Sequence, residues 1–337
     1  FASVGAVAVL AAVVAIGAPR APGYLRASDA EAVEGALRPA VAPPSSAGAA
    51  PATAPTTTAT RVLSATTLPT PAPSLPAPGT TPFDPTLPQL VPDDASADPA
   101  GRHGRDLRVM VAGDSVGWTL ARYAGPHLEA PVRIDNRALV GCGVMPGDAQ
   151  IVARKTGATA YPGLCEEAPE ADRLGIAGRP DVVLLWVGAW EIYDHRYQDT
   201  IYRAGTPKAA TLVEERIQLR IDRYRTAGLP TVLSLLPCFT DGEAAFDDKR
   251  LFLERLDEER VEWVNDRVRA VAARNLGWVR LIDPREALCT PDGGARLLPD
   301  EGRQVRIDGA HFDEGSAPWL WDTWLAGQLA AALPPPG

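Results

Sequence analysis

Two short motifs in this sequence carry residue types that perform nucleophilic catalysis, and the first is Gly113-Asp114-Ser115. It follows a predicted strand over residues 108–112 and precedes a predicted helix over residues 118–124. A serine at a strand-to-helix turn presents its hydroxyl at the edge of the sheet, and the N–H groups of a helix N-terminus can stabilise an oxyanion. The motif therefore predicts that Ser115 is a nucleophile.

A serine nucleophile needs a base, and the second motif offers one. The chain has four histidines, which are His103, His127, His195 and His311. His311 follows Asp308 by three residues, a spacing that lets the carboxylate hold the imidazole Nδ1–H while Nε2 takes the serine proton. A surface turn capped by Asp308 is the alternative interpretation. We expect Asp308 and His311 to complete a Ser-His-Asp triad.

The hydrophobic pattern predicts the elements that must position these residues. Apolar and β-branched runs predict strands at residues 108–112, 132–136, 182–187, 231–235 and 279–282. Helical patterns lie at residues 118–124, 212–227, 254–275 and 317–332. Strands that alternate with helices predict a parallel sheet that is covered on both faces.

The two motifs together resemble the SGNH (GDSL-type) hydrolase family, and the resemblance extends from Arg108 to about Leu333. It implies a flavodoxin-like three-layer α/β/α sandwich with a parallel sheet, in which Ser115 is the nucleophile and Asp308 and His311 complete the triad. Residues 113–117 also fit the nucleophile elbow of α/β hydrolases. In that fold, however, the serine follows several earlier strands, whereas here it follows the first.

The same resemblance implies an oxyanion hole. The nucleophile's own N–H is one donor, and a glycine after the second strand supplies another; Gly141 matches that position, with Gly143 as the alternative. The family's third block usually reads Gly-x-Asn-Asp, whose Asn is a further donor. Here it reads Gly188-Ala-Trp190-Glu191, so the Asn is missing. The Trp190 indole N–H could replace it, or the ring could simply pack.

Three further residues are expected near the site. Asp114 is predicted to make structural hydrogen bonds in its turn, and it is placed with Gly188 and Glu191 at a possible lip of the site. For Glu191, a solvated loop is the alternative interpretation. No cofactor is expected, and no Cys or His cluster suggests a metal site.

A Trp-Glu third block, a Gly-Cys-Gly second block and an apolar N-terminus resemble one SGNH subgroup. That subgroup is the extracytoplasmic domain fused to the membrane domain of acyltransferase family three, which O-acylates cell-surface glycans. The resemblance implies a carbohydrate or acyl-ester substrate and a membrane acyltransferase domain in the same full-length chain. It also implies membrane attachment, with the catalytic domain on the extracytoplasmic side.

The N-terminal third differs sharply from the rest of the chain. Residues 1–18 are uncharged and rich in Ala and Val, which predicts a transmembrane helix, with a cropped signal peptide or a buried core helix as alternatives. Residues 19–105 are rich in Pro, Ala and Thr and are expected to form a disordered linker. The SGNH hydrolase-like domain is expected over residues 106–333.

Charge and cysteine content limit the class of protein further. The net charge of -9 argues against a nucleic-acid partner, which would require a basic surface. Four cysteines suit two disulfides in an oxidising compartment or, alternatively, four buried thiols. Of the three possible pairings we expect Cys142–Cys165 and Cys238–Cys289.

Three functions remain open from the sequence. The first is serine-dependent O-acyl transfer to, or ester hydrolysis on, an extracytoplasmic carbohydrate. The second is a free-standing exported GDSL-type esterase or lipase. The third is a glycan-binding module without catalysis, against which the intact Ser, Asp and His set argues.

Overall fold

The computed structural model describes residues 90–91, 105–125, 128–157, 159–160, 165–241 and 253–333. The predicted membrane helix, nearly all of the predicted linker, His103 and His127 lie outside these residues. Within them, no helix is both long and apolar enough to cross a bilayer.

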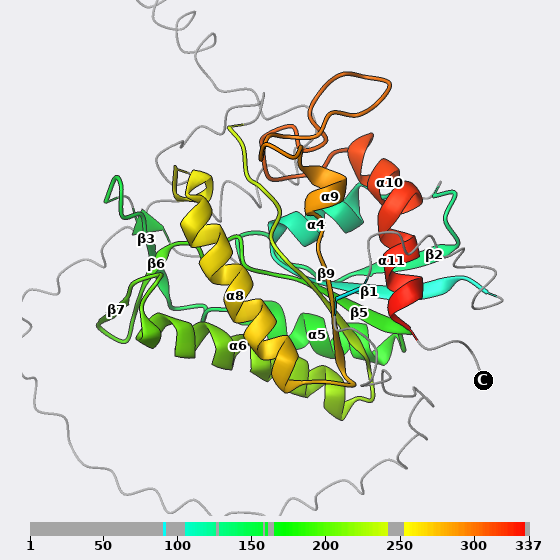
Figure 1. The fold of residues 1–337 in the computed structure, drawn as a ribbon. Coiled ribbons are helices and arrows are strands. Elements are labelled where there is room, and N and C mark those ends of the chain that lie inside the picture. Colours follow the sequence, from blue (N-terminus) through cyan, green and yellow to red (C-terminus); the bar gives the residue numbers. More distant parts are fainter. Residues whose placement is uncertain are drawn as a thin grey trace, which may run out of the picture.

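The centre of the fold is a parallel sheet of five strands in the order β2-β1-β5-β8-β9 (Figure 1). The strands are β1 (Leu107–Gly113), β2 (Val132–Asn136), β5 (Val182–Trp186), β8 (Thr231–Ser234) and β9 (Val279–Ile282). Each coincides with a predicted strand to within one residue at either end. The second strand, β2, lies at the edge of the sheet, and β1 lies between β2 and β5. This is the strand order of flavodoxin-like doubly wound folds.

Both faces of the sheet are apolar because helices cover both. In β1, Val109 and Val111 enter one core cluster, while Met110 and Ala112 enter the other. Successive side chains of a strand point to opposite faces, so a strand covered on both sides is hydrophobic throughout. The sandwich thus has three layers, as the sequence predicts.

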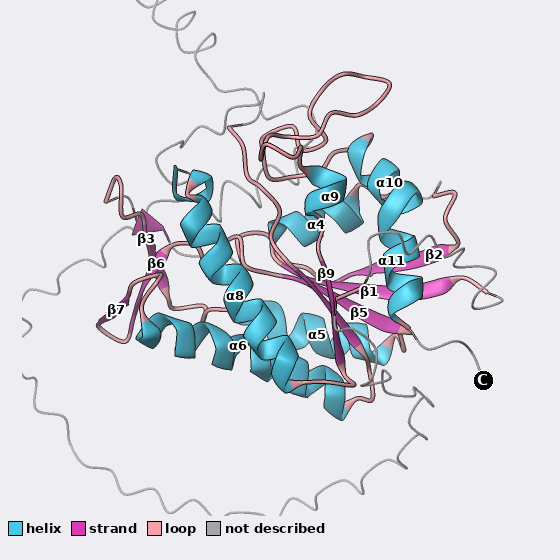
Figure 2. Cartoon of the chain, viewed as in Figure 1, coloured by secondary structure: helices cyan, strands magenta, loops and turns pink. Residues whose placement is uncertain are grey.

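The helices divide between the two faces (Figure 2). One face is covered by α4 (Ser115–Arg122), α10 (Ser316–Leu320), the π-helical η3 (Trp321–Leu325) and α11 (Ala326–Ala332). The other is covered mainly by α6 (Pro207–Thr226) and α8 (Glu258–Arg274), with α5 (Ala168–Ala177) beside them. Short elements are η1 (Cys165–Glu167), η2 (Leu253–Leu256) and α9 (Arg285–Leu288).

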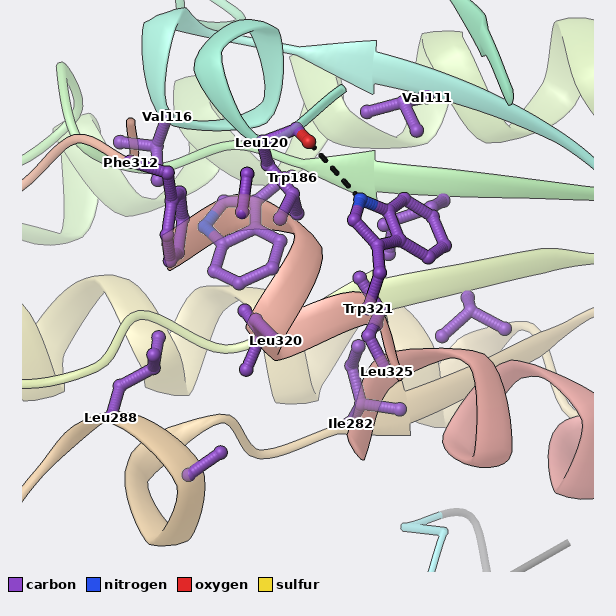
Figure 3. Close-up of a cluster of buried hydrophobic side chains, with 14 of the residues drawn as sticks. Val111, Val116, Leu120, Trp186, Ile282, Leu288, Phe312, Leu320, Trp321 and Leu325 are labelled. Atoms are coloured by element: carbon purple, nitrogen blue, oxygen red, sulfur yellow. Dashed lines mark hydrogen bonds between the residues drawn. The ribbon is translucent and has the colours of Figure 1, made fainter. Parts of the chain in front are cut away.

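The first helix of the domain packs against the C-terminal helical segment, and the contacting residues are 201 positions apart in the chain. The Trp321 indole Nε1–H donates to the carbonyl of Leu120, 3.0 Å away (Figure 3). Phe312 packs edge-on against Trp186, with ring centroids 6.2 Å apart. This core holds the segment after residue 307 against α4, so the two sequence motifs become neighbours.

Several predicted helix boundaries move for local reasons. The helix predicted at residues 118–124 begins at Ser115, because the Asp114 carboxylate caps it. The helix predicted from residue 212 begins at Pro207, since Thr206 caps it and proline suits the first helical position. The predicted helix over residues 254–275 is η2 followed by α8, and the one over 317–332 contains the π-helical segment.

Two features were not predicted. A second, antiparallel sheet has the order β4-β3-β6-β7, with β3 (Gln150–Val152), β4 (Thr159–Ala160), β6 (Asp194–Tyr197) and β7 (Thr200–Tyr202). These strands have two to four residues, too few for an alternating pattern to stand out. The helix α5 was also missed, because its buried residues are Asp172 and Gly175, which make no apolar pattern in the sequence.

Disulfides join Cys142 to Cys165 and Cys238 to Cys289, which is the expected pairing. The first fixes the segment after β2, and the second joins the segment after β8 to the residue after α9. Both segments follow the carboxyl ends of their strands, the edge where doubly wound sheets place their sites.

Candidate active site

Ser115 is the first residue of α4, and the turn before it fixes its place. Gly113 ends β1 with φ = 134°, and a Cβ there would lie 1.7 Å from the Trp186 carbonyl oxygen. Only glycine therefore lets β1 run this close to β5. Asp114 donates its N–H to the same Trp186 oxygen over 3.0 Å, and the chain then turns into the helix.

Asp114 makes the structural bonds expected of it. Its Oδ1 accepts a hydrogen bond from the Val116 N–H at 2.9 Å, and its Oδ2 accepts one from the Ala189 N–H at 3.2 Å. The residue is fully buried, and burial raises the pKa of its carboxyl, against the hydrogen bond from Val116. Asp114 thus caps α4 and ties it to the loop after β5, so it does not form an exposed lip.

The second motif meets the first at this turn. His311 Nε2 lies 2.8 Å from Ser115 Oγ, and His311 Nδ1 lies 2.6 Å from Asp308 Oδ2. The other oxygen, Asp308 Oδ1, accepts the backbone N–H groups of Ala310 at 2.8 Å and His311 at 2.6 Å. The alternative of a surface turn at Asp308 is wrong, because this residue is only 7% exposed.

The charge at Asp308 is held by its neighbours. Burial alone would raise the pKa of this carboxyl, but the His311 imidazole and the N–H groups of His311 and Ala310 outweigh it and lower the pKa to about 2. Asp308 is therefore ionised at every ordinary pH. An ionised carboxylate on Nδ1 keeps Nε2 free to accept a proton from Ser115.

A third contact fixes the orientation of the histidine segment. The Phe312 N–H donates to Thr119 Oγ1, one turn along α4 from Ser115, at 3.3 Å. Thr119 was not singled out from the sequence, because a threonine inside a helix carries no signal of a tertiary hydrogen bond. It ties the base to the helix that carries the hydroxyl.

The segment after β2 runs toward the same turn. Arg137 donates its N–H to the Val111 carbonyl at 2.7 Å, and Leu139 donates to the Gly113 carbonyl at 3.0 Å. Gly141 follows two residues later. No described residue accepts a hydrogen bond from the backbone N–H of Ser115 or of Gly141. The assignment of Gly141 as the second oxyanion donor remains a prediction.

Trp190 lies in a small cluster with Ile151 and Tyr193. Its ring is 6.0 Å from that of Tyr193, and the Arg255 guanidinium stands 5.3 Å from its centre. The side chain is 3% exposed, and its Nε1–H has no partner among the described residues. Packing of the indole is therefore shown, whereas its service as an oxyanion donor remains a prediction.

Gly188 and Glu191 do not form a lip or a solvated loop. Both are buried, and Glu191 is only 1% exposed. The Glu191 carboxylate turns inward, where Oε1 accepts the Val144 N–H at 2.7 Å. Burial raises the pKa of this carboxyl to about 7, opposed by the Val144 N–H and assisted by the charge of Asp114. The expectation failed because a Glu in a loop is usually solvated.

A cavity of about 1020 Å³ opens beside this region, between the segment after β8, the start of α8 and the segment after α9. Phe239, Arg255 and Arg296 are among its lining residues. Ser115 and His311 do not line it. The cavity therefore does not include the contact between Ser115 and His311.

No protein-family model matches the chain, and no curated protein matches it. Similar solved structures include an acetyl xylan esterase, at 14% identity and a TM-score of 0.40, covering 67% of this chain and 99% of that one. A GDSL-like lipase from Bacteroides thetaiotaomicron has 12% identity and a TM-score of 0.39, covering 64% of this chain and 84% of that one.

A third similar structure is the periplasmic domain of a lipopolysaccharide acetyltransferase from Salmonella ser. Paratyphi A. It has 12% identity and a TM-score of 0.38, and the match covers 66% of this chain and 83% of that one. At such identities and scores these likenesses carry no argument about chemistry. What the present site can do follows from its own hydrogen bonds.

Proposed function

We propose that this domain is a serine-dependent acyl-transfer enzyme of the SGNH type, and that its acceptor is an extracytoplasmic carbohydrate. The observation that carries the proposal is the hydrogen-bonded series from Ser115 Oγ through His311 to Asp308. Nucleophile, base and orienting acid stand within the distances that such a triad requires.

In the first half of the reaction, Ser115 Oγ attacks the carbonyl carbon of an acyl ester while His311 Nε2 takes the hydroxyl proton. The bond from this carbon to the leaving alkoxide then breaks, and His311 returns the proton to that oxygen. The products are an alcohol and an acyl ester on Ser115. Asp308 stays ionised and stabilises the imidazolium between the two proton transfers.

In the second half, a hydroxyl group resolves the acyl enzyme. His311 takes the proton of the incoming hydroxyl, whose oxygen attacks the acyl carbon; the bond to Ser115 Oγ breaks, and the proton returns to Ser115. A sugar hydroxyl gives transfer and water gives hydrolysis, so one triad supports both. We favour transfer because of the sequence's resemblance to the domain fused to acyltransferase family three.

Negative charge develops on the carbonyl oxygen in both halves. We assign its stabilisation to the N–H groups of Ser115 and Gly141, with the Trp190 Nε1–H as a third donor. A donor of this kind contributes about 3 kcal/mol to lowering the barrier. The absent Asn of the third block makes the two backbone donors more important here.

The location belongs to the same proposal. Two disulfides suit a domain that folds in an oxidising compartment. Together with the apolar residues 1–18 and the Pro-rich stretch after them, they favour a membrane-anchored protein whose catalytic domain is extracytoplasmic. A free-standing exported esterase is the alternative, and the hydrogen-bonded triad argues against a purely glycan-binding module.

The test is labelling with a serine-reactive fluorophosphonate, followed by a search for the acceptor. The wild-type domain should be labelled and Ser115→Ala should not. With an acyl donor and cell-wall glycan, transfer predicts that the acyl group appears on the glycan, while an esterase releases it as free acid. A wild-type protein that resists the probe and binds glycan would support the binding module instead.

A further inference from the structure

The segment of residues 141–145, which we name the donor loop, carries the second N–H assigned to the oxyanion. It has no regular secondary structure, so helix or strand hydrogen bonds do not fix it. A backbone donor must be held in place before the reaction if it is to stabilise the developing charge. The contacts that hold this loop therefore bear directly on the chemistry.

Two ties from distant parts of the chain hold it. The disulfide between Cys142 and Cys165 fixes its second residue. The Glu191 carboxylate fixes its fourth, since Glu191 Oε1 accepts the Val144 N–H at 2.7 Å. Glu191 is buried, so this hydrogen bond is shielded from water, and an oxygen of the carboxyl group can accept it whether the group is protonated or ionised.

The absence of a side chain at Gly143 leaves room for the Glu191 carboxylate that holds the loop. A Cβ at residue 143 would lie 2.0 Å from Glu191 Oε1, inside the volume that the carboxylate occupies. The backbone of Gly143 does not have a positive φ, so conformational freedom does not require glycine there. What requires it is the close approach of the carboxylate to the loop.

Glu191 is itself held beside the nucleophile. Its N–H donates to the Gly188 carbonyl at 3.1 Å, which closes a tight turn after β5. Within that turn, the Ala189 N–H donates to Asp114 Oδ2, next to Ser115. The turn thus connects the nucleophile's cap on one side with the donor loop on the other.

From this arrangement we infer that Glu191 is a positioning residue, which holds the donor loop through Val144 so that the Gly141 N–H faces the oxyanion formed at Ser115. The inference rests on the proposed function. It gives Glu191 of the third block an indirect role. In the family's usual block an Asn side chain donates to the oxyanion itself, whereas here Glu191 holds the loop that carries the Gly141 N–H.

The chain supplies a matched control. Glu254 is also fully buried, and its Oε1 accepts a backbone N–H, that of Lys155, at 2.7 Å. Its Oε2, like Glu191 Oε2, has no partner among the described residues. The two carboxylates differ in what they hold, because Lys155 belongs to the segment after β3 and not to the donor loop.

The experiment compares Glu191→Ala, Glu191→Gln and Glu254→Ala in the chain of residues 1–337, with p-nitrophenyl acetate as the substrate. Glu191→Ala should lower kcat about 100-fold with little change in KM, the signature of a lost transition-state contact. Glu191→Gln keeps an oxygen that can accept the Val144 N–H, so it should recover most of that loss. Glu254→Ala should lose stability while the folded enzyme keeps its kcat.

A second variant approaches the same contact from the loop, in case Glu191→Ala does not fold. Gly143→Ala should expel the carboxylate and lower kcat by a similar factor. Adding Glu191→Ala to Gly143→Ala should cost little more, since the tie is already broken. Equal kcat in wild type, Glu191→Ala and Gly143→Ala would overturn the inference.

Failure of the inference differs from failure of the proposed function. If Ser115→Ala abolishes turnover but neither tie variant lowers kcat, Ser115 is the nucleophile and Glu191 is merely structural. If Ser115→Ala leaves turnover unchanged, the proposed function itself is wrong. In that case any effect of Glu191 on the reaction has another origin.

Discussion

The two sides of the serine are built in different ways. On one side, His311 and Asp308 reach Ser115 through side-chain hydrogen bonds of 2.8 and 2.6 Å. On the other, the assigned donor is a backbone N–H in an irregular loop, held by a disulfide and a buried carboxylate. The proposed chemistry of the first side depends on the side chains of His311 and Asp308. That of the second side depends on the position of the backbone in the donor loop.

This contrast predicts two kinds of loss. Changing a triad residue removes chemistry and should leave the loop in place. Removing a contact that holds the donor loop leaves every reacting group in place. It should only make the position of the Gly141 N–H less well defined. Losses on the triad side should therefore be larger and less easily rescued by conservative substitution.

The largest loss is expected from the base. Replacing His311 by Ala removes the group proposed to take the Ser115 proton, and kcat for ester cleavage should fall on the order of 10⁴-fold or more. Steady-state kinetics with p-nitrophenyl acetate measures this. The double variant with Ser115→Ala should be no worse than either single one, because the two residues act as a unit; additive losses would contradict that.

A loss nearly as large is expected for Asp308→Asn. The amide cannot hold the imidazole with Nε2 free for the serine proton, so kcat should fall on the order of 10³- to 10⁴-fold while KM changes little. A circular dichroism spectrum like that of the wild type would confirm that the fold survives. A loss of less than tenfold would mean that Asp308 does not orient His311.

On the donor-loop side, the Glu191 carboxyl makes stability depend on pH. Its pKa rises from an ordinary 4.5 to about 7, so the unfolded chain gives up this proton at lower pH than the folded chain. Stability from this group is thus full below about pH 4.5 and is lost as pH rises through about 7. Relative to Glu191→Gln, wild type should lose about 3 kcal/mol across that window.

Urea unfolding of both proteins between pH 4 and 8 measures this difference. Parallel stability curves for wild type and Glu191→Gln would contradict a raised pKa at Glu191. Asp308 does not disturb the comparison, since its pKa is lowered to about 2 and it remains ionised throughout.

The smallest effect on kcat is expected from removing the disulfides, and this effect should differ between the two disulfides. Replacing Cys142 and Cys165 by Ser loosens one of two ties on the donor loop and should lower kcat about tenfold, less than the full loss of an oxyanion donor. Replacing Cys238 and Cys289 should cost about 3 kcal/mol of stability but leave the kcat of the folded enzyme nearly unchanged. Equal kcat losses for the two pairs would show that the donor loop has no special dependence on its disulfide.

The contacts among Ser115, His311 and Asp308 were predicted from the sequence, because they depend on residue types and spacing, while the catalytic role of these residues remains a prediction. Gly113, Ser115, Asp308 and His311 each have chemistry that few other residues could supply, and the five parallel strands are continuous apolar runs. The membrane helix and linker predicted over residues 1–105 remain predictions, since almost all of these residues lie outside the part of the chain that the structure describes.

The donor-loop side was predicted less well, for a physical reason. Every residue except proline has a backbone N–H, so no residue type marks a donor. Glu191 was expected at an exposed lip because a carboxylate is rarely buried, and its partner Val144 is 47 positions away in the chain. Gly143 was predicted only as an alternative oxyanion donor to Gly141. Its close approach to the Glu191 carboxylate is visible only in the structure.

The most direct test of the central claim is to trap the acyl enzyme. The wild-type domain is mixed with p-nitrophenyl acetate, quenched in acid on the millisecond timescale and digested for mass spectrometry. We predict one acetyl group on Ser115, formed at the rate of the nitrophenolate burst and lost when an acceptor hydroxyl is supplied. Turnover without acetyl on Ser115, or full turnover by Ser115→Ala, would contradict the claim that this serine is the nucleophile.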